Sequence, residues 1–167
     1  KALKLVNSVK DFDKLFQGDG DLGARLYQVQ TLQKEISPYK ILIGADLPTL
    51  SITHIETAIA ALQNENDIVI GKSFDGGFWL WATSKDVPLE IFEAVTYSRK
   101  DTLEKLIKVL REYNPDWKID THSLPLMNDV DTGEDLTKLK NELIELEQKE
   151  GLKPELNRIK IYLDEAK

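Results

Sequence analysis

Acidic side chains end or follow apolar stretches of the sequence at three separate points. Asp46 ends the run ILIGAD, and Asp75 comes directly after DIVIGKSF. Asp129 and Asp131 flank Val130 in the segment MNDVDTGEDL. Hard divalent cations such as Mg²⁺ and Mn²⁺ prefer oxygen ligands, and they need few carboxylates when waters or phosphate oxygens complete the shell. The chemistry that these residues suggest is the binding of such a cation, for which Asp46 needs a second carboxylate nearby.

Asp46 also has a simple structural interpretation. It can be the polar terminus of a strand, because Pro48 prevents the strand from continuing and Ser51 is a suitable N-cap for the next helix. The spacing around Asp46 is compatible with both interpretations, so both stay open at this point.

The acidic segment near residue 130 offers the second carboxylate. Thr132 and Asp135 have the spacing of a capping box, and acidic residues in the first turn stabilise a helix by about 0.3–1 kcal/mol each. Helix stabilisation accounts well for Glu134 and Asp135. It accounts less well for Asp129 and Asp131, which precede the helix and project to opposite sides of an extended segment. One of these two could face a binding crevice.

Two glycine-rich segments could approach a ligand closely. In FDGGFWLWA, Gly76 and Gly77 follow Asp75 and permit either a tight turn into a strand or a close backbone contact with a ligand. The segment QGDGDLGARL matches the pattern GxGxxG, but it lacks the lysine of a phosphate-binding P-loop and follows no clear strand. We therefore give a dinucleotide site little weight.

Composition excludes several classes of protein. The chain has 167 residues and 41% apolar content, which predicts one domain over residues 1–167. A net charge of −7 without clustered lysine and arginine argues against nucleic acid or an anionic membrane as partner. The absence of cysteine excludes thiolate chemistry and predicts a cytoplasmic location. The two histidines, His54 and His122, have no partnered nucleophile and are assigned no catalytic role. The first residues from Lys1 onward are already in mid-pattern, so an N-terminal truncation is expected.

Apolar runs of strand length alternate with amphipathic runs of helix length, which indicates an α/β domain with a largely parallel sheet. The predicted strands are KILIGAD (40–46), DIVIGKS (67–73), GFWLWAT (77–83) and, more weakly, WKIDTHS (117–123). Only three residues separate the second and third strands, too few for a helical crossover. These two strands either form a hairpin, or one of them leaves the parallel sheet.

Helices are predicted where apolar side chains recur at steps of three and four residues, within 21–36, 52–62, 103–110 and 136–146. Pro154 suits the first turn of a last helix, so two C-terminal helices are expected over 132–149 and 153–165. In an open α/β sheet, ligands bind beyond the carboxyl ends of the strands. Asp46 and Asp75 are both expected at such ends.

Five segments, in this order, resemble the bacterial DUF2064 family: QGDGDLGARL, ILIGADLPTL, FDGGFWLWA, TYSRKDTLEKL and LPLMNDVDTGEDL. Members of this family are also described as arsenosugar-biosynthesis-type or radical-SAM/selenodomain-associated glycosyltransferases of the GT-A superfamily. The resemblance implies a three-layer, nucleotide-diphospho-sugar transferase-like fold. Its mixed, mostly parallel sheet would be flanked by helices, with the donor nucleotide at the strand ends.

The resemblance also implies roles for individual residues. Asp46 and Asp131 match the acidic positions that would hold one Mg²⁺ or Mn²⁺. Asp75 would orient or deprotonate the hydroxyl group of a small-molecule acceptor. The positions that would line the nucleotide or the acceptor and sugar side are Gln17, Gly20, Gly23, Arg25, Gly76, Gly77 and Phe78.

The sequence departs from the family pattern at three points, one of which is an extra Asp-Gly pair in QGDGDLGARL. Family members begin with a strand and a basic, glycine-containing loop that packs on the nucleotide phosphates, and nothing in this sequence corresponds to that segment. In TYSRKD, Tyr97 stands where a tryptophan is usual and Arg99 follows the serine, which could alter the choice of acceptor.

The function that the resemblance implies is a metal-dependent transferase acting on a nucleotide-activated donor, foremost a nucleotide sugar. Nucleotidyl transfer to a small phosphorylated substrate is one alternative. A non-catalytic domain of the same fold is the other, because the phosphate loop is absent. The sequence predicts no oligomeric state.

Overall fold

The computed structural model describes residues 16–32 and 37–165, and the elements follow the expected alternation of strands and helices. Two predictions concern residues outside these ranges. They are the absence of an N-terminal strand and loop, and the last turn of the helix predicted over 21–36. The helices are α2 (Leu22–Leu32), α3 (Ile52–Gln63), α4 (Leu89–Glu93), α5 (Thr102–Tyr113), α6 (Gly133–Glu150) and α7 (Pro154–Glu165). The strands are β1 (Lys40–Ile43), β2 (Ile68–Lys72), β3 (Phe78–Thr83) and β4 (Ile119–Asp120).

The sheet has the strand order β1-β3-β2-β4 and is mixed, as predicted. β2 and β3 form a hairpin, which decides between the two arrangements that the short connection allowed. β3 also pairs antiparallel with β1, and β2 pairs parallel with β4. Three strands therefore run in one direction, but only one of the three pairings is parallel, because β3 lies between β1 and β2. The five-residue link 73–77 is too short for a helical crossover, so β3 returns antiparallel beside β2.

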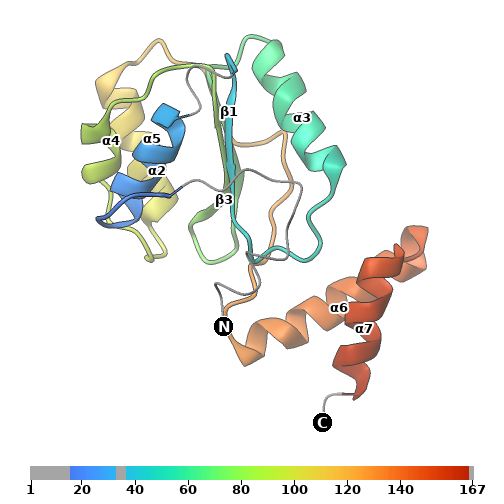
Figure 1. The fold of residues 1–167 in the computed structure, drawn as a ribbon. Helices are drawn as coiled ribbons and strands as arrows, with labels where there is room; N and C mark the ends of the chain where they lie inside the picture. Colours follow the sequence, from blue (N-terminus) through green and yellow to red (C-terminus); the bar gives the residue numbers. More distant parts are fainter. Residues whose placement is uncertain (1–15, 33–36, 166–167) are drawn as a thin grey trace.

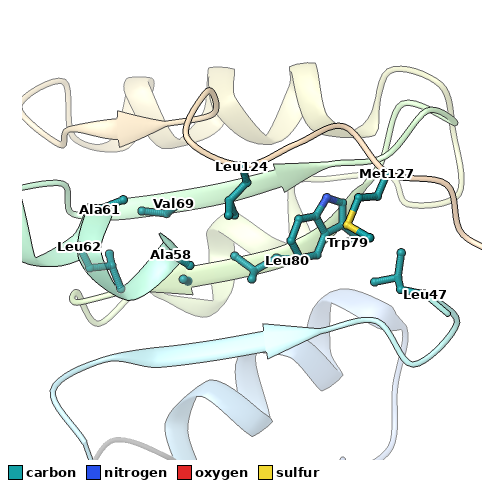
Figure 2. Packing of buried hydrophobic residues seen from close by; sticks show 10 residues of the cluster. Leu47, Ala58, Ala61, Leu62, Val69, Trp79, Leu80, Leu124 and Met127 are labelled. Atoms are coloured by element: carbon teal, nitrogen blue, oxygen red, sulfur yellow. The ribbon is translucent and has the colours of Figure 1, made fainter. Parts of the chain in front are cut away.

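Helices cover both faces of the sheet, which confirms the three layers. Figure 1 shows α3 on one side of the sheet and α2, α4 and α5 on the other. On the α3 side, Ala58 and Leu62 pack with Val69 of β2 and Leu80 of β3 (Figure 2). On the opposite side, the fully buried ring of Trp81 lies 5.5 Å from that of Phe92 in an edge-on arrangement. Both faces of β2 and β3 are thus buried, which explains their lack of alternation.

The first predicted helix forms, but the stripe of apolar side chains that marked it is only partly buried. Leu22 and Leu32 are about half exposed, whereas Gly23 and Gln30 are buried. The Gln30 side chain donates to the carbonyl of Val87 at 2.9 Å and accepts from Trp81 Nε1 at 3.3 Å. A buried polar group with both partners satisfied can replace an apolar one, and apolar periodicity does not detect it.

The two C-terminal helices pack side by side beyond the three layers (Figure 1). The predicted capping box is confirmed, since Thr132 N–H donates to Asp135 Oδ2 at 2.9 Å and Asp135 N–H donates back to Thr132 Oγ1 at 3.4 Å. A hydrogen bond of 3.0 Å from Thr49 Oγ1 to Glu142 Oε1 ties α6 to the loop that follows β1. Within the described part of the chain, no helix combines the length and apolarity that crossing a bilayer requires.

His54 makes the stability of the fold depend on pH. It lies in the first turn of α3, where its Nδ1 atom accepts a hydrogen bond of 3.2 Å from the backbone N–H of Ser51. Burial lowers the pKa of His54 below its ordinary value of 6.5, so the unfolded chain takes up this proton at a higher pH than the folded protein does. The free energy of unfolding is therefore expected to fall as the pH drops below about 6.5.

Urea denaturation between pH 7.5 and 5.5 measures this dependence. His54→Gln keeps an acceptor for the Ser51 N–H but removes the titration, and it should flatten the curve. His122 is exposed, so His122→Gln serves as the matched control and should leave the slope of the wild type unchanged. If the stability of His54→Gln depends on pH as steeply as that of the wild type, protonation of His54 does not affect the stability of the fold.

Candidate functional site

A cavity of about 420 Å³ opens beyond the carboxyl ends of β1 and β2, where the α/β pattern places ligand sites. Residues Ile43 to Asp46 bring the end of β1 to it, and Ser73 brings the end of β2. Apolar side chains from α2, β1 and β3 form much of its wall. Four aspartates line the same cavity: Asp46, Asp75, Asp129 and Asp131.

Backbone hydrogen bonds join the acidic segments that are distant in sequence. Val130 N–H donates to the carbonyl of Asp46 at 3.0 Å, so the segment around residue 130 lies directly beside the end of β1. Met127 N–H donates to the carbonyl of Lys72, and Phe74 N–H donates to that of Met127, each at 3.1 Å. The segment therefore runs along the end of β2 as well.

Core packing fixes the same arrangement from the other side. Leu47 directly follows Asp46, and Met127 precedes Asp129 by two positions. Both apolar side chains are buried against Trp79 at the end of the sheet (Figure 2). The Trp79 indole N–H donates to the carbonyl of Pro125 at 3.1 Å, which holds the approach to this segment. A buried tryptophan thus positions the two acidic segments through their apolar neighbours.

Asp75 sits in a tight turn that packs on the loop before α5. Gly77 N–H donates to Asp75 Oδ1 at 2.8 Å, and Gly76 adopts φ +91°. A Cβ atom on Gly76 would lie 2.0 Å from the carbonyl oxygen of Lys100, so only glycine fits there. The N–H of Leu103 donates to the Gly76 carbonyl at 3.0 Å. The turn and the loop before α5 therefore form one packed unit.

The cavity concentrates negative charge. Burial, and then the charges of Asp75, Asp131 and Asp46, raise the pKa of the Asp129 carboxyl above its ordinary value. None of the ion pairs among the described residues involves any of these four carboxylates. Like charges that gather in one cavity repel one another, and a bound cation would relieve the repulsion.

The donor set fits a divalent cation that shares its ligands with a second molecule. No three acidic or histidine side chains in the described ranges converge closely enough to hold a metal by themselves. Mg²⁺ is commonly held by one or two carboxylates, with substrate phosphates and waters completing its shell. Asp46 and Asp131 both line the cavity, so a cation held by these two carboxylates would need phosphate or water oxygens to complete its shell.

The structure brings together most, but not all, of the residues predicted for the site. Gln17, Asp46, Asp75, Gly77, Phe78 and Asp131 line the cavity. Gly20, Gly23, Arg25 and Gly76 are not among the residues of its wall. Gly23 is buried beneath α4, where a Cβ atom would lie 2.7 Å from the Phe92 carbonyl oxygen, and the side chain of Arg25 is exposed. Close packing between elements is thus a sufficient reason for glycine at Gly23 and Gly76.

Other residues of the cavity were not predicted as site residues, although the departures at Tyr97 and Arg99 suggested an effect on the choice of acceptor. Asp129 was recognised only as one of two carboxylates that could face a crevice, and both of them line the cavity. The loop Tyr97, Ser98 and Arg99 also reaches it. Ser98 adopts φ +57°, a conformation that is uncommon for residues other than glycine and that often marks functional loops. This conformation has no signature in the sequence.

Comparisons with known proteins agree with the fold. A solved structure from Desulfovibrio desulfuricans G20, provisionally assigned as a nucleotide-diphospho-sugar transferase, is similar to the chain with a TM-score of 0.71 and 23% sequence identity. The similarity covers 88% of this chain and 62% of that one, so the chain spans less than two thirds of that structure's length. The expected nucleotide-diphospho-sugar transferase-like fold is confirmed. A search of curated proteins found no match.

The sequence also matches a family model. The model of DUF2064, described as an uncharacterized protein conserved in bacteria, matches residues 2–99. This range contains Asp46 and Asp75, whereas Asp131 lies beyond it. Because the match covers more than half of the sequence, the chain belongs to the DUF2064 family.

Proposed function

We propose that the chain forms part of a metal-dependent transferase that uses a nucleotide-activated donor, foremost a nucleotide sugar. The observation that carries this proposal is the hydrogen bond from Val130 N–H to the Asp46 carbonyl, which brings Asp46 and Asp131 to one cavity at the strand ends. The similar structure from Desulfovibrio desulfuricans G20 supports the same class of donor.

The four aspartates divide into two roles in this proposal. Asp46 and Asp131 would hold Mg²⁺ or Mn²⁺ together with the phosphate oxygens of the donor. The bound cation would supply Lewis-acid stabilisation of the leaving diphosphate. Asp129 lines the same cavity and would strengthen the negative field that attracts the cation.

Asp75 would orient the hydroxyl group of the acceptor and take up its proton. Its Oδ1 atom already accepts the N–H of Gly77, which fixes the carboxylate and leaves Oδ2 without a hydrogen bond among the described residues. Oδ2 is therefore the atom that can accept the acceptor's proton. Gly77 and Phe78 line the cavity next to Asp75 and would contact the acceptor or the sugar.

A thermal-shift panel of nucleoside diphosphates and nucleotide sugars, each with and without Mn²⁺, tests the proposal. A true donor should raise the melting temperature only when the cation is present, because a ligand at 100 times its Kd stabilises the folded state by about 2.7 kcal/mol. The donors that respond are then incubated with candidate acceptors, and release of the nucleoside diphosphate is measured. Release of pyrophosphate from nucleoside triphosphates would instead indicate nucleotidyl transfer. If no nucleotide shifts the melting temperature with Mn²⁺, the result favours the non-catalytic alternative over the proposed transferase.

A further inference from the structure

One basic side chain stands among the carboxylates of the cavity. Within the described ranges, Arg99 is the one lysine or arginine that lines the cavity, where four aspartates also lie. Its side chain is 60% exposed, so a small molecule that enters the cavity can reach it. None of the ion pairs of the described residues joins Arg99 to these four aspartates, so they do not neutralise its charge in an ion pair.

The loop holds the backbone of Arg99 in one position. Arg99 N–H donates to Thr102 Oγ1, and Thr102 N–H donates to the Arg99 carbonyl, each at 3.1 Å. Thr102 is buried, and its hydroxyl group donates to the carbonyl of Thr96 at 3.0 Å. Together with the left-handed conformation of Ser98, these bonds fix the direction in which the Arg99 side chain leaves the loop.

A neighbouring carboxylate restrains the guanidinium group but leaves its outer edge available. Arg99 Nε lies 3.4 Å from Asp101 Oδ1, an enclosed oxygen that makes no hydrogen bond to any described residue, and Lys105 Nζ lies 2.9 Å from the other oxygen. No hydrogen bond or ion pair within the described residues uses the two Nη atoms of Arg99. A guanidinium edge presents two parallel N–H groups, which match the two oxygens of a phosphate or a carboxylate.

Arg99 belongs to the same packed unit as Asp75. Gly76, next to Asp75, lies directly on the carbonyl of Lys100, next to Arg99. The residues proposed to bind the donor diphosphate, Asp46 and Asp131, lie instead on the segments after β1 and before α6. A group bound by Arg99 would therefore share the Asp75 side of the cavity with the acceptor.

We infer that Arg99 determines acceptor specificity by binding an anionic group, so that the acceptor is a hydroxyl compound carrying a phosphate or a carboxylate. This inference rests on the proposed function, since that function assigns the Asp75 side to the acceptor. The two anions share one chemistry, a pair of oxygens facing the guanidinium edge. Contact of Arg99 with the donor diphosphate is the competing outcome.

Isothermal titration of glycerol 3-phosphate, glycerate and glycerol, without metal or nucleotide, tests the inference. The three probes share a carbon skeleton and differ in the anionic group. At least one charged probe should bind about 10- to 100-fold more tightly than glycerol, as expected for a pair of charge-assisted hydrogen bonds. The charged probe that binds more tightly identifies the class of acceptor.

Variants separate Arg99 from other sources of anion binding. Arg99→Ala should remove the preference for the charged probe, and Arg99→Lys should keep only part of it, because lysine cannot present two parallel N–H groups. Arg111, exposed on α5 outside the cavity, is the matched control, and Arg111→Ala should bind all three probes as the wild type does.

The test also distinguishes this inference from the proposed function. Equal affinity for the three probes, or no binding of any, would overturn the inference. So would an Arg99→Ala variant whose only defect is weaker Mn²⁺-dependent nucleotide binding, which would assign Arg99 to the donor. Asp46→Ala removes one negative charge from the cavity, so it should bind the charged probe at least as tightly as the wild type. If nucleotides fail to bind while Arg99-dependent binding persists, the proposed function fails and the anion site remains.

Discussion

Asp46→Ala is expected to weaken Mn²⁺-dependent nucleotide binding by about 100-fold or more, because removing one partner of a close charge pair costs roughly 2–5 kcal/mol. The variant should fold as stably as the wild type, or slightly more stably. Asp46 is exposed to the cavity and contributes to the charge that raises the pKa of Asp129, so its removal relieves repulsion. Calorimetry with Mn²⁺ and the nucleotide selected from the panel measures the binding, and urea denaturation measures the stability.

Two further variants make the result specific. Asp46→Asn keeps the shape of the side chain but not its charge. Its affinity for the nucleotide should lie between those of Asp46→Ala and the wild type. Asp116 is exposed and lies outside the cavity, so Asp116→Ala should bind the nucleotide as the wild type does. Unchanged binding by Asp46→Ala would remove the metal-ligand assignment and, with it, the central step of the proposed mechanism.

Gly76→Ala is expected to destabilise the protein by about 2 kcal/mol or more, since it combines an unfavourable backbone conformation with a steric clash. Gly76 has φ +91°, and its new Cβ atom would lie 2.0 Å from the carbonyl oxygen of Lys100. Backbone cannot move aside as a flexible side chain can, so the turn and the loop before α5 must separate. For a protein of this size the melting temperature should fall by about 4–8 °C.

Gly133→Ala provides the matched control for this substitution. Gly133 begins α6, and no atom of the described residues lies within 4 Å of the position of an added Cβ atom. Alanine there should be neutral or stabilise the protein by about 0.4–1 kcal/mol, because it restricts the unfolded chain. If Gly76→Ala and Gly133→Ala have equal stability, the close packing between the Asp75 turn and the Arg99 loop does not exist in solution. The inference about Arg99 would then lose its link to Asp75.

Local signals in the sequence predicted the helices and their ends well. Thr132 with Asp135 forms the expected capping box, Ser51 is the N-cap of α3, and Pro154 begins α7. These features depend on residues within one or two turns of the chain, so spacing is enough to detect them. The short helix α4 was not predicted, because its five residues span little more than one turn and show no repeat.

The periodicity of apolar residues did not predict the buried face of α2. Gly23 and Gln30 are buried because α4 and Trp81 approach them, and neither residue is apolar enough to signal burial. The same limit applies to Arg99. Its place in the cavity follows from the buried Thr102 and from the left-handed conformation of Ser98, which only the folded loop reveals.

The sequence by itself determined which carboxylates end strands or precede helices, and it indicated the family from five ordered motifs. It could not determine which strand would lie beside which. β3 takes its place between β1 and β2, and the acidic segment of Asp131 aligns with the end of β2. Only the tertiary structure decided that Asp46, Asp75, Asp129 and Asp131 share one cavity. Their convergence depends on long-range backbone pairing and on the burial of Leu47 and Met127 against Trp79, and neither can be read from the spacing of residues along the chain.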